Sequence, residues 1–296
     1  MSLRDKAADF LAEKRRLMRR GNLSAATVEQ YRHVMESIWL PWCDEQRGLD
    51  DVADCTDDVL ERFTDHLAAK TIQKRDGTMK RLSVVTVRTY IRAVRVFLTW
   101  AKAPKGDYRP PKEPRRLVDT LTRQEIDRME RAARDERDKL IVRVLGDTGI
   151  RISELLGLRP ADLRANAREH RYFIRVIGKG DKEREVAIPK ETFERLKRLA
   201  DHTRATTIFF ARRGEGEMTH HAADKMMHRL AEQAGIGRRV TPHLFRHSYI
   251  TNQIARGTNL EAIRRSVGHT SLAMIVGVYS HVTPDDTYDM LMAALK

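Results

Sequence analysis

The segment Thr241-Pro242-His243-Leu244-Phe245-Arg246-His247 predicts the first turns of a helix. Threonine is a favoured N-cap, and proline is favoured at the first helical position because its missing N–H needs no partner there. His243 and Arg246 lie three residues apart, so both project from one face near a helix N-terminus, which favours anions. Ordinary surface residues or a zinc-binding histidine pair are the alternatives, but a protease-type zinc motif needs glutamate where this chain has Leu244.

Two segments upstream carry further charged residues at structural junctions. In Gly146-Asp147-Thr148-Gly149-Ile150-Arg151-Ile152-Ser153-Glu154-Leu155, an arginine follows a glycine-terminated helix and a glutamate stands three residues later. A salt bridge at a helix junction is the ordinary interpretation of such a pair. Residues 172–176 and 186–188 alternate in polarity around the turn-rich 178–181, which predicts a β-hairpin with Lys179 near its tip. An exposed, solubilising lysine is the alternative there.

The C-terminal region contains a histidine and a tyrosine at a fixed spacing. Gly268 is expected to end a helix, His269 follows it directly, and Tyr279 stands ten residues after that histidine. A single tyrosine is more often a packing residue than a nucleophile, so this segment indicates little by itself.

The first hundred residues are expected to be all-helical. Ser24, Thr56 and Ser83 are predicted N-caps, and the helix that follows Ser83 has an apolar face beside a cationic face. That cationic face consists of Arg88, Arg92 and Arg95. Solvated helix faces usually mix charge signs, whereas no acidic residue occurs between Arg81 and Gly106. The pattern therefore favours a polyanionic partner.

Length and composition set broad limits on the protein. The 296 residues favour two domains, and the formal net charge of +14 with 33% charged residues is typical of a basic globular protein. No apolar stretch approaches the roughly 20 residues of a bilayer span, and the N-terminus lacks the apolar region of a secretory signal. Cys43 and Cys55 are too few for a disulfide framework or a cysteine zinc site. We expect a cytoplasmic protein with no membrane partner.

The charge and proline distribution predicts the domain boundaries. Residues 102–118 hold six basic and two acidic residues, and four prolines disfavour a helix there. We therefore expect a helical domain at 1–101, a basic linker at 102–118 and a second domain at 119–296. A capping box of Thr122 and Glu125 opens the first helix of that second domain.

Taken together and in this order, the four charged segments of residues 146–281 resemble the tyrosine recombinase family of phage integrases and Xer-type resolvases. The resemblance implies a mainly α fold with a small β-hairpin or sheet. A helical core-binding domain and an α+β catalytic domain would form a C-shaped clamp on DNA. Phe245 stands where the family usually has leucine, an apolar exchange. Because the core-binding domain would begin almost at Met1, we expect no arm-type DNA-binding domain.

The resemblance assigns a role to each motif residue. Its catalytic set is Arg151, Lys179, His243, Arg246, His269 and the nucleophile Tyr279, with Glu154 in support. Guanidinium groups suit phosphate oxygens because they stay charged and bind in a bidentate manner. A tyrosine hydroxyl, with a reference pKa near 10, needs a proton acceptor, for which His243 is the candidate. Lys179 would protonate the leaving 5′ oxygen. Tyr288 is the rival nucleophile, and it lacks the following histidine.

The implied activity is site-specific cutting and rejoining of DNA through a 3′-phosphotyrosyl intermediate and a Holliday junction. The implied partners are double-stranded recombination sites and three further copies in a homo-tetramer on DNA, assembled through a C-terminal oligomerisation tail. Accessory directionality proteins and host DNA-bending proteins are further candidates. No cofactor, metal or ATP is required. The expected DNA-binding residues are Arg81, Arg88, Arg92, Arg95, Lys102 and Lys105.

Two other functions use the same residues. A type IB topoisomerase would relax a supercoiled plasmid that lacks any recombination site. A DNA-binding regulator with relic catalytic residues would form no covalent complex with nicked DNA. The presence of all six catalytic residues argues against the regulator.

Overall fold

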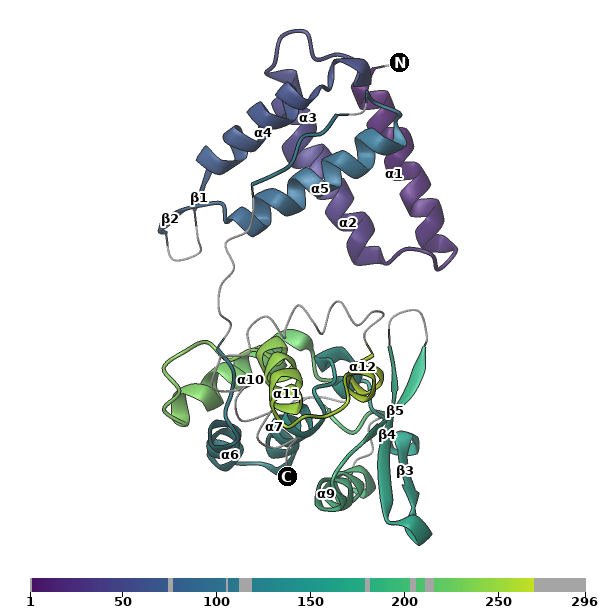
Figure 1. Ribbon diagram of the computed structural model, residues 1–296, viewed down its shortest axis with the longest axis vertical. Helices are drawn as coiled ribbons and strands as arrows, with labels where there is room; N and C mark the ends of the chain where they lie inside the picture. Colours follow the sequence, from purple (N-terminus) through teal and green to yellow (C-terminus); the bar gives the residue numbers. More distant parts are fainter. Residues whose placement is uncertain are drawn as a thin grey trace. The chain divides into compact units, whose positions relative to one another are not determined.

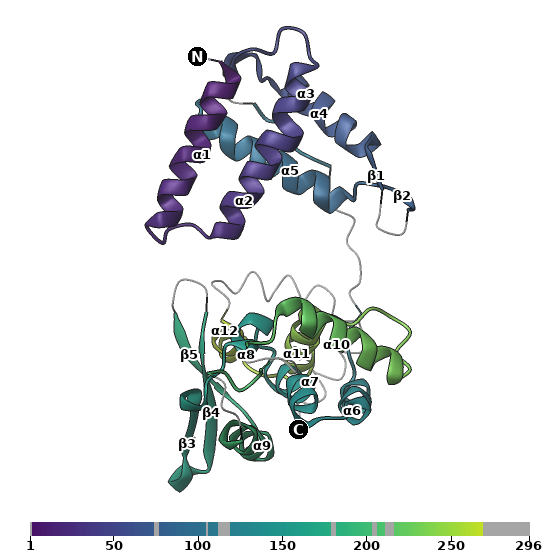
Figure 2. The same cartoon turned by 180° about the vertical axis from the view of Figure 1, so that it is seen from behind.

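The computed structural model describes residues 2–73, 77–104, 106–111, 119–178, 182–202, 206–210 and 216–268. The chain divides into two compact units, Met1–Arg116 and Leu117–Lys296, whose main helices and strands are labelled in Figure 1 and seen from behind in Figure 2. Each unit has its own hydrophobic core. Helices dominate both units and the sheets are small, which confirms the expected mainly α fold class.

The elements of the N-terminal unit are α1 (Leu3–Arg19), α2 (Ala25–Val34), the π-helix η1 (Met35–Trp39), α3 (Leu40–Asp44), the 3₁₀-helix η2 (Val52–Asp54), α4 (Asp57–Ala69), β1 (Thr71–Gln73), β2 (Met79–Arg81) and α5 (Val84–Trp100). Those of the C-terminal unit are α6 (Arg123–Ala132), α7 (Glu136–Thr148), α8 (Ile152–Leu156), η3 (Pro160–Asp162), β3 (Leu163–Asn166), η4 (Ala167–Glu169), β4 (Arg171–Ile177), β5 (Glu183–Ala187), α9 (Lys190–Asp201), α10 (His220–Gln233), α11 (Pro242–Ala255) and α12 (Leu260–Val267).

The helix predicted from Ser24 through Trp42 is interrupted by η1. Ser24 caps α2 through its side-chain oxygen, as the sequence predicts. Pro41 has no N–H to donate within the helix, and its ring would collide with the carbonyl four residues earlier. A π-turn relieves that collision by widening the helix, and the N–H of Leu40 donates to the carbonyl of Met35 instead.

A segment beyond α5 is held on the N-terminal unit. The Asp57 carboxylate at the start of α4 accepts hydrogen bonds from the backbone N–H groups of Asp107 (2.7 Å) and Tyr108 (3.0 Å). The Tyr108 hydroxyl donates to Thr64 (2.6 Å), and Arg88 on α5 donates to the carbonyl of Pro111 (2.8 Å). Residues 106–111 of the expected linker are therefore ordered by contacts with α4 and α5.

The C-terminal unit is built around α7. Five apolar residues of this helix, Leu140, Ile141, Val142, Val144 and Leu145, have no exposed surface, and the helix packs against α6, α8, α9 and α11. Beside these helices, β3, β4 and β5 form an antiparallel sheet in that order. The predicted hairpin is β4–β5, in which Ile174 faces Val186. Within the described ranges, no helix has the length and apolar character to cross a membrane.

Candidate active site and DNA interface

The turn between α7 and α8 places two motif residues. Gly149 ends α7 in the left-handed conformation (φ 61°), and a Cβ atom there would lie 2.5 Å from the Tyr249 ring. Only glycine fits this position without a shift. Arg151 then becomes the N-cap of α8, and Glu154 Oε2 accepts a hydrogen bond from its backbone N–H (2.8 Å). Glu154 Oε1 also accepts from Arg151 Nη1 (2.9 Å), so the glutamate fixes both backbone and guanidinium.

Arg246 reaches the same turn from α11, whose Thr241 cap and Pro242 are as predicted. Its side chain is buried, with Nη1 donating to the carbonyl of Gly149 (2.8 Å) and Nη2 to that of Val267 (2.5 Å). Burial, together with the nearby positive charge of Arg151, lowers the pKa of Arg246 to about 10. The guanidinium therefore remains charged at neutral pH, although its position disfavours charge.

Arg151 and Arg246 together form what we call the arginine pair. The positive charge of Arg151 disfavours the charged state of Arg246, while the acceptors that hold Arg246 are neutral carbonyls. An anion bound to both guanidinium groups would relieve this repulsion through charge-assisted hydrogen bonds. The arrangement is therefore suited to a phosphate group.

His243 lies one turn before Arg246, in the first turn of α11, and is exposed. The structure thus brings Arg151, Glu154 and Arg246 together and places His243 on the adjoining helix start. Lys179, His269, Tyr279 and the rival Tyr288 lie outside the described residues.

Arg184 on β5 belongs to this site, although its sequence context predicts no role for it. It donates from Nη1 and Nη2 to the two oxygens of Glu154, at 3.0 and 2.8 Å, and from Nε to the carbonyl of Ser266 (2.7 Å). Burial alone raises the pKa of Glu154, but the hydrogen bonds from Arg184 and Arg151 outweigh it and hold that pKa below its ordinary value. The alternation of side chains along a strand could have identified Arg184, because it places this arginine on the inward face of β5 together with Val186.

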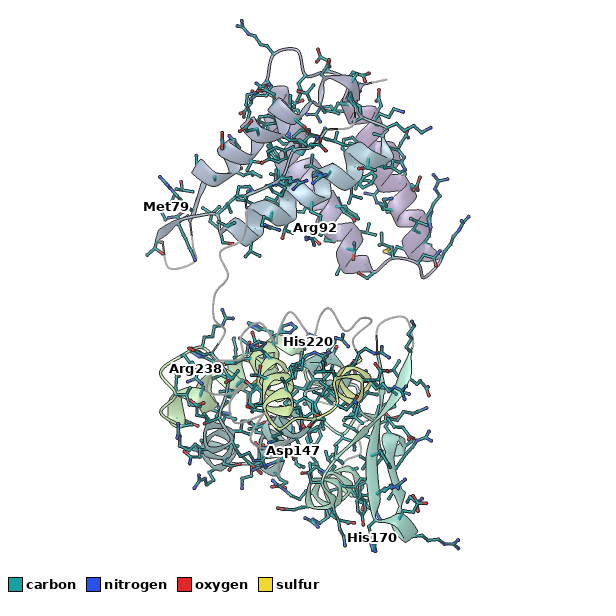
Figure 3. All side chains as sticks on the ribbon, viewed as in Figure 1. Met79, Arg92, Asp147, His170, His220 and Arg238 are labelled. Atoms are coloured by element: carbon teal, nitrogen blue, oxygen red, sulfur yellow. The ribbon has the colours of Figure 1, made fainter. Side chains whose placement is uncertain are left out.

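The expected DNA-binding arginines lie together on the N-terminal unit. Arg88, Arg92 and Arg95, here called the α5 stripe, line one groove of about 480 Å³ with Ile91 and Pro110. Arg88 is half-buried, whereas Arg92 and Arg95 are exposed, and Figure 3 labels Arg92 on α5.

Two other expected DNA-binding residues, Arg81 and Lys102, do not line this groove. Arg81 is exposed on β2, opposite Thr71. Lys102 is exposed just after α5, with a positive φ of 61°. Lys105 lies outside the described residues.

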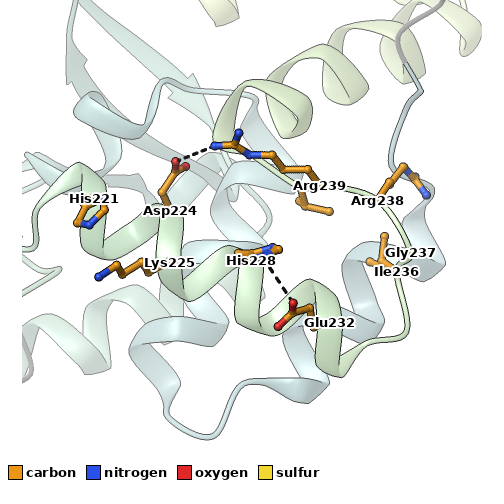
Figure 4. A pocket seen from close by; sticks show the side chains of 10 residues that line it. His221, Asp224, Lys225, His228, Glu232, Ile236, Gly237, Arg238 and Arg239 are labelled. Carbon is orange, nitrogen blue, oxygen red and sulfur yellow. Dashed lines mark ion pairs between the residues drawn. The ribbon is translucent and has the colours of Figure 1, made fainter. Parts of the chain in front are cut away.

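A different pocket, of about 640 Å³, lies beside α10 and the segment that leads to α11 (Figure 4). Several polar residues of its lining lie close to one another: Arg239 lies 3.8 Å from Asp224, and His228 lies 3.5 Å from Glu232. Arg238 is held by Glu125 (2.7 Å). Neither member of the arginine pair lines this pocket. In the described part of the chain, no group of three or more His, Cys, Asp or Glu residues is arranged to hold a metal ion.

Comparison with known proteins places this geometry in a family. Residues 119–285 match the phage integrase family. Tyrosine recombinase XerD of Listeria monocytogenes serotype 4b (strain F2365) is 26% identical over 282 residues, which cover 88% of this chain and 89% of the relative. The crystal structure of XerA recombinase is 26% identical, with a TM-score of 0.52, and covers 97% of this chain and 98% of that one.

A further solved structure shares the fold. The XerH site-specific recombinase bound to palindromic difH substrate aligns with a TM-score of 0.70 at 17% identity, covering 97% of this chain and 85% of that one. The chain belongs to the phage integrase family, and it is a tyrosine-type site-specific DNA recombinase. The resemblance based on the four motif segments is confirmed.

Proposed function

We propose that the arginine pair binds the scissile phosphate of a recombination site while Tyr279 attacks it. The observation that carries this proposal is the position of the buried Arg246 beside Arg151. Two backbone carbonyls orient Arg246, and Glu154 orients Arg151. Such preorganised donors stabilise charge that develops on the non-bridging oxygens without reorganising during the reaction. Solvent-exposed arginines would lose that advantage.

The proposed step exchanges one phosphoester bond for another. The Tyr279 oxygen forms a bond to phosphorus, the bond from phosphorus to the 5′ oxygen breaks, and a 3′-phosphotyrosyl link results. His243 accepts the tyrosine proton, Lys179 donates a proton to the departing 5′ oxygen, and His269 hydrogen-bonds the phosphate. The free 5′ hydroxyl of the partner strand then reverses the step, so bond energy is retained and no ATP is consumed.

The two units would hold the duplex between them. In this proposal residues 1–101 are the core-binding domain, 119–296 the catalytic domain, and the two form a C-shaped clamp joined by 102–118. The α5 stripe, Arg81, Lys102 and Lys105 contact the DNA backbone. Four protomers assemble on two recombination sites through the tail of residues 283–296, and a Holliday junction connects the two rounds of strand exchange. Relatives described in complex with DNA support the nucleic-acid partner.

Trapping on nicked DNA tests the proposal. A nick beside the scissile phosphate lets the 5′ fragment diffuse away, so the covalent complex accumulates. Tyr279→Phe should bind this DNA normally and form no covalent complex, because only the hydroxyl is lost. The matched control Tyr288→Phe should trap like the wild type. A covalent complex that survives in Tyr279→Phe and disappears in Tyr288→Phe would overturn the assignment.

A further inference from the structure

Arg184 lies where three elements of the C-terminal unit meet. Its guanidinium on β5 binds both oxygens of Glu154 on α8 and the carbonyl of Ser266 in the last turn of α12. The Arg184 side chain is 14% exposed and that of Glu154 only 2%. These are charge-assisted bonds in a mostly dry environment, where geometry is held tightly.

Two glycines fit closely around this guanidinium. A Cβ atom on Gly268, which ends α12 with φ 67°, would lie 2.9 Å from Arg184 Cζ. A Cβ atom on Gly178 would lie 3.4 Å from Arg184 Nη1 and 3.6 Å from Glu154 Oε1. Gly178 also closes the base of the β4–β5 hairpin by donating to the carbonyl of Lys182 (2.8 Å). The Arg184 site thus joins the hairpin base to α8 and α12.

The orientation of Arg151 depends on the same carboxylate. Glu154 accepts four hydrogen bonds, two from Arg184 and two from the backbone and side chain of Arg151. The bidentate bond to Arg184 fixes the plane of the carboxylate, and that plane sets the direction in which Oε1 holds Arg151 Nη1. Without Arg184, a buried carboxylate with one cationic partner would be free to rotate toward Arg151 and bind more of its donors.

We propose that Arg184 is a positioning residue for the arginine pair, acting through Glu154 on Arg151. It leaves the remaining Arg151 donors free for the phosphate. This inference rests on the proposed function, in which Arg151 binds the scissile phosphate. Arg184 itself makes no contact with DNA.

Arg184→Lys is the test variant, because lysine keeps the charge and cannot bind both carboxylate oxygens as a planar fork. The rate of covalent-complex formation at saturating nicked DNA should fall about a hundredfold, because small displacements of oriented groups reduce rates by this order. The dissociation constant for DNA and the melting temperature should change little. The matched control is Arg175→Lys on neighbouring β4, whose guanidinium binds Asp162 (2.7 Å) and not Glu154. It should cleave like the wild type.

Two readouts separate positioning from a general structural defect. A methylphosphonate at the scissile position replaces one charged oxygen with a neutral methyl group, so it should restore much of the Arg184→Lys rate. In a double-mutant cycle, Arg184→Lys should add no further loss to Arg151→Lys, and should multiply the loss caused by Arg246→Lys. Absence of rescue, or losses that multiply with Arg151→Lys, would overturn the inference. If Arg151→Lys alone cleaves at the wild-type rate, the proposed function fails instead.

Discussion

Arg92 and Arg95 on α5 extend into solvent along a groove, whereas Arg246 on α11 is buried and donates to two backbone carbonyls. Arg151 is likewise held by a carboxylate that Arg184 holds in turn. Binding a duplex backbone requires positive charge within reach of phosphates, and flexible side chains supply it. Stabilising a transition state requires donors already in place. In our proposal arginine therefore serves two purposes, and the number of other groups that hold each side chain distinguishes them.

Removing the proposed general acid should produce the largest effect on rate. In the proposed mechanism the arginine pair stabilises charge on the non-bridging oxygens and does nothing for the leaving 5′ oxygen. Lys179→Ala should therefore cleave ordinary DNA roughly a hundred- to ten-thousandfold more slowly while binding it normally.

The Lys179 prediction is checked with a sulfur substrate. When sulfur replaces the bridging 5′ oxygen, the thiolate leaves without a proton, so Lys179→Ala should approach the wild-type rate. Arg246→Ala should remain slow on the same DNA. A Lys179→Ala variant that sulfur does not rescue would move the acid to another residue, with Lys182 next.

The Glu154 carboxylate should stabilise the fold in a pH-dependent way. Its pKa is lowered in the folded state, so its stabilisation is fully present above the unfolded value near 4.5 and is lost as pH falls through the folded value. Glu154→Gln should cost about 3 kcal/mol in urea unfolding at pH 7, because it leaves Arg184 without its ionic partner. The difference from wild type should shrink below pH 4.5. A difference independent of pH would show that the ionised carboxylate is not what stabilises this site.

Gly149 should be more sensitive to alanine than a left-handed glycine with open space around it. Gly149→Ala adds a clash with Tyr249 to the backbone strain, whereas Gly235 has the same kind of φ (68°) with no atom within 4 Å of a Cβ. Gly235→Ala should cost roughly 1 kcal/mol and Gly149→Ala about 2 kcal/mol more, by urea unfolding. Folded Gly149→Ala should also cleave about tenfold more slowly, since its carbonyl holds Arg246. Equal costs at both sites would show that the close approach to Tyr249 does not constrain this turn.

Neutralising the α5 stripe should change binding and leave the cleavage rate unchanged. Replacing Arg88, Arg92 and Arg95 with alanine should weaken binding to all DNA sequences and reduce the salt slope by roughly one unit per lost phosphate contact. The matched control is Arg4, Arg32 and Arg62, which pair with carboxylates on the same unit, replaced by alanine together. This triple variant removes the same amount of positive charge and should barely alter the salt dependence of DNA binding. Equal salt slopes for both triple variants would show that the α5 stripe is an ordinary solvated helix face that makes no phosphate contacts.

Local signals in the sequence were sufficient for several of the helix boundaries. Ser83 and Thr122 cap α5 and α6, and Gly149 and Gly268 end α7 and α12, because caps depend on neighbouring residues only. The expectation that the first hundred residues are all-helical was wrong. The β1–β2 hairpin was not predicted, because the residues of both strands are exposed and show no apolar alternation. The short strand β3 was missed as well, and it too is mostly exposed.

The candidate site was predictable in part. The motifs along the chain singled out Arg151, Glu154 and Arg246, and the structure brings these three residues together. The partners of Arg184 lie 30 and 82 residues away in the chain, so no local pattern could identify them. The burial of Arg246 between the carbonyls of Gly149 and Val267 is likewise a property of the folded chain.

The central claim is that the arginine pair stabilises the transition state and contributes little to holding DNA. Single-turnover formation of the covalent complex by Arg246→Ala, at a DNA concentration far above the dissociation constant, tests it most directly. We expect the rate to fall roughly a hundred- to thousandfold, as for loss of one preorganised donor, with a dissociation constant within a few-fold of wild type. A wild-type rate at saturating DNA, with the whole loss in binding, would contradict the claim.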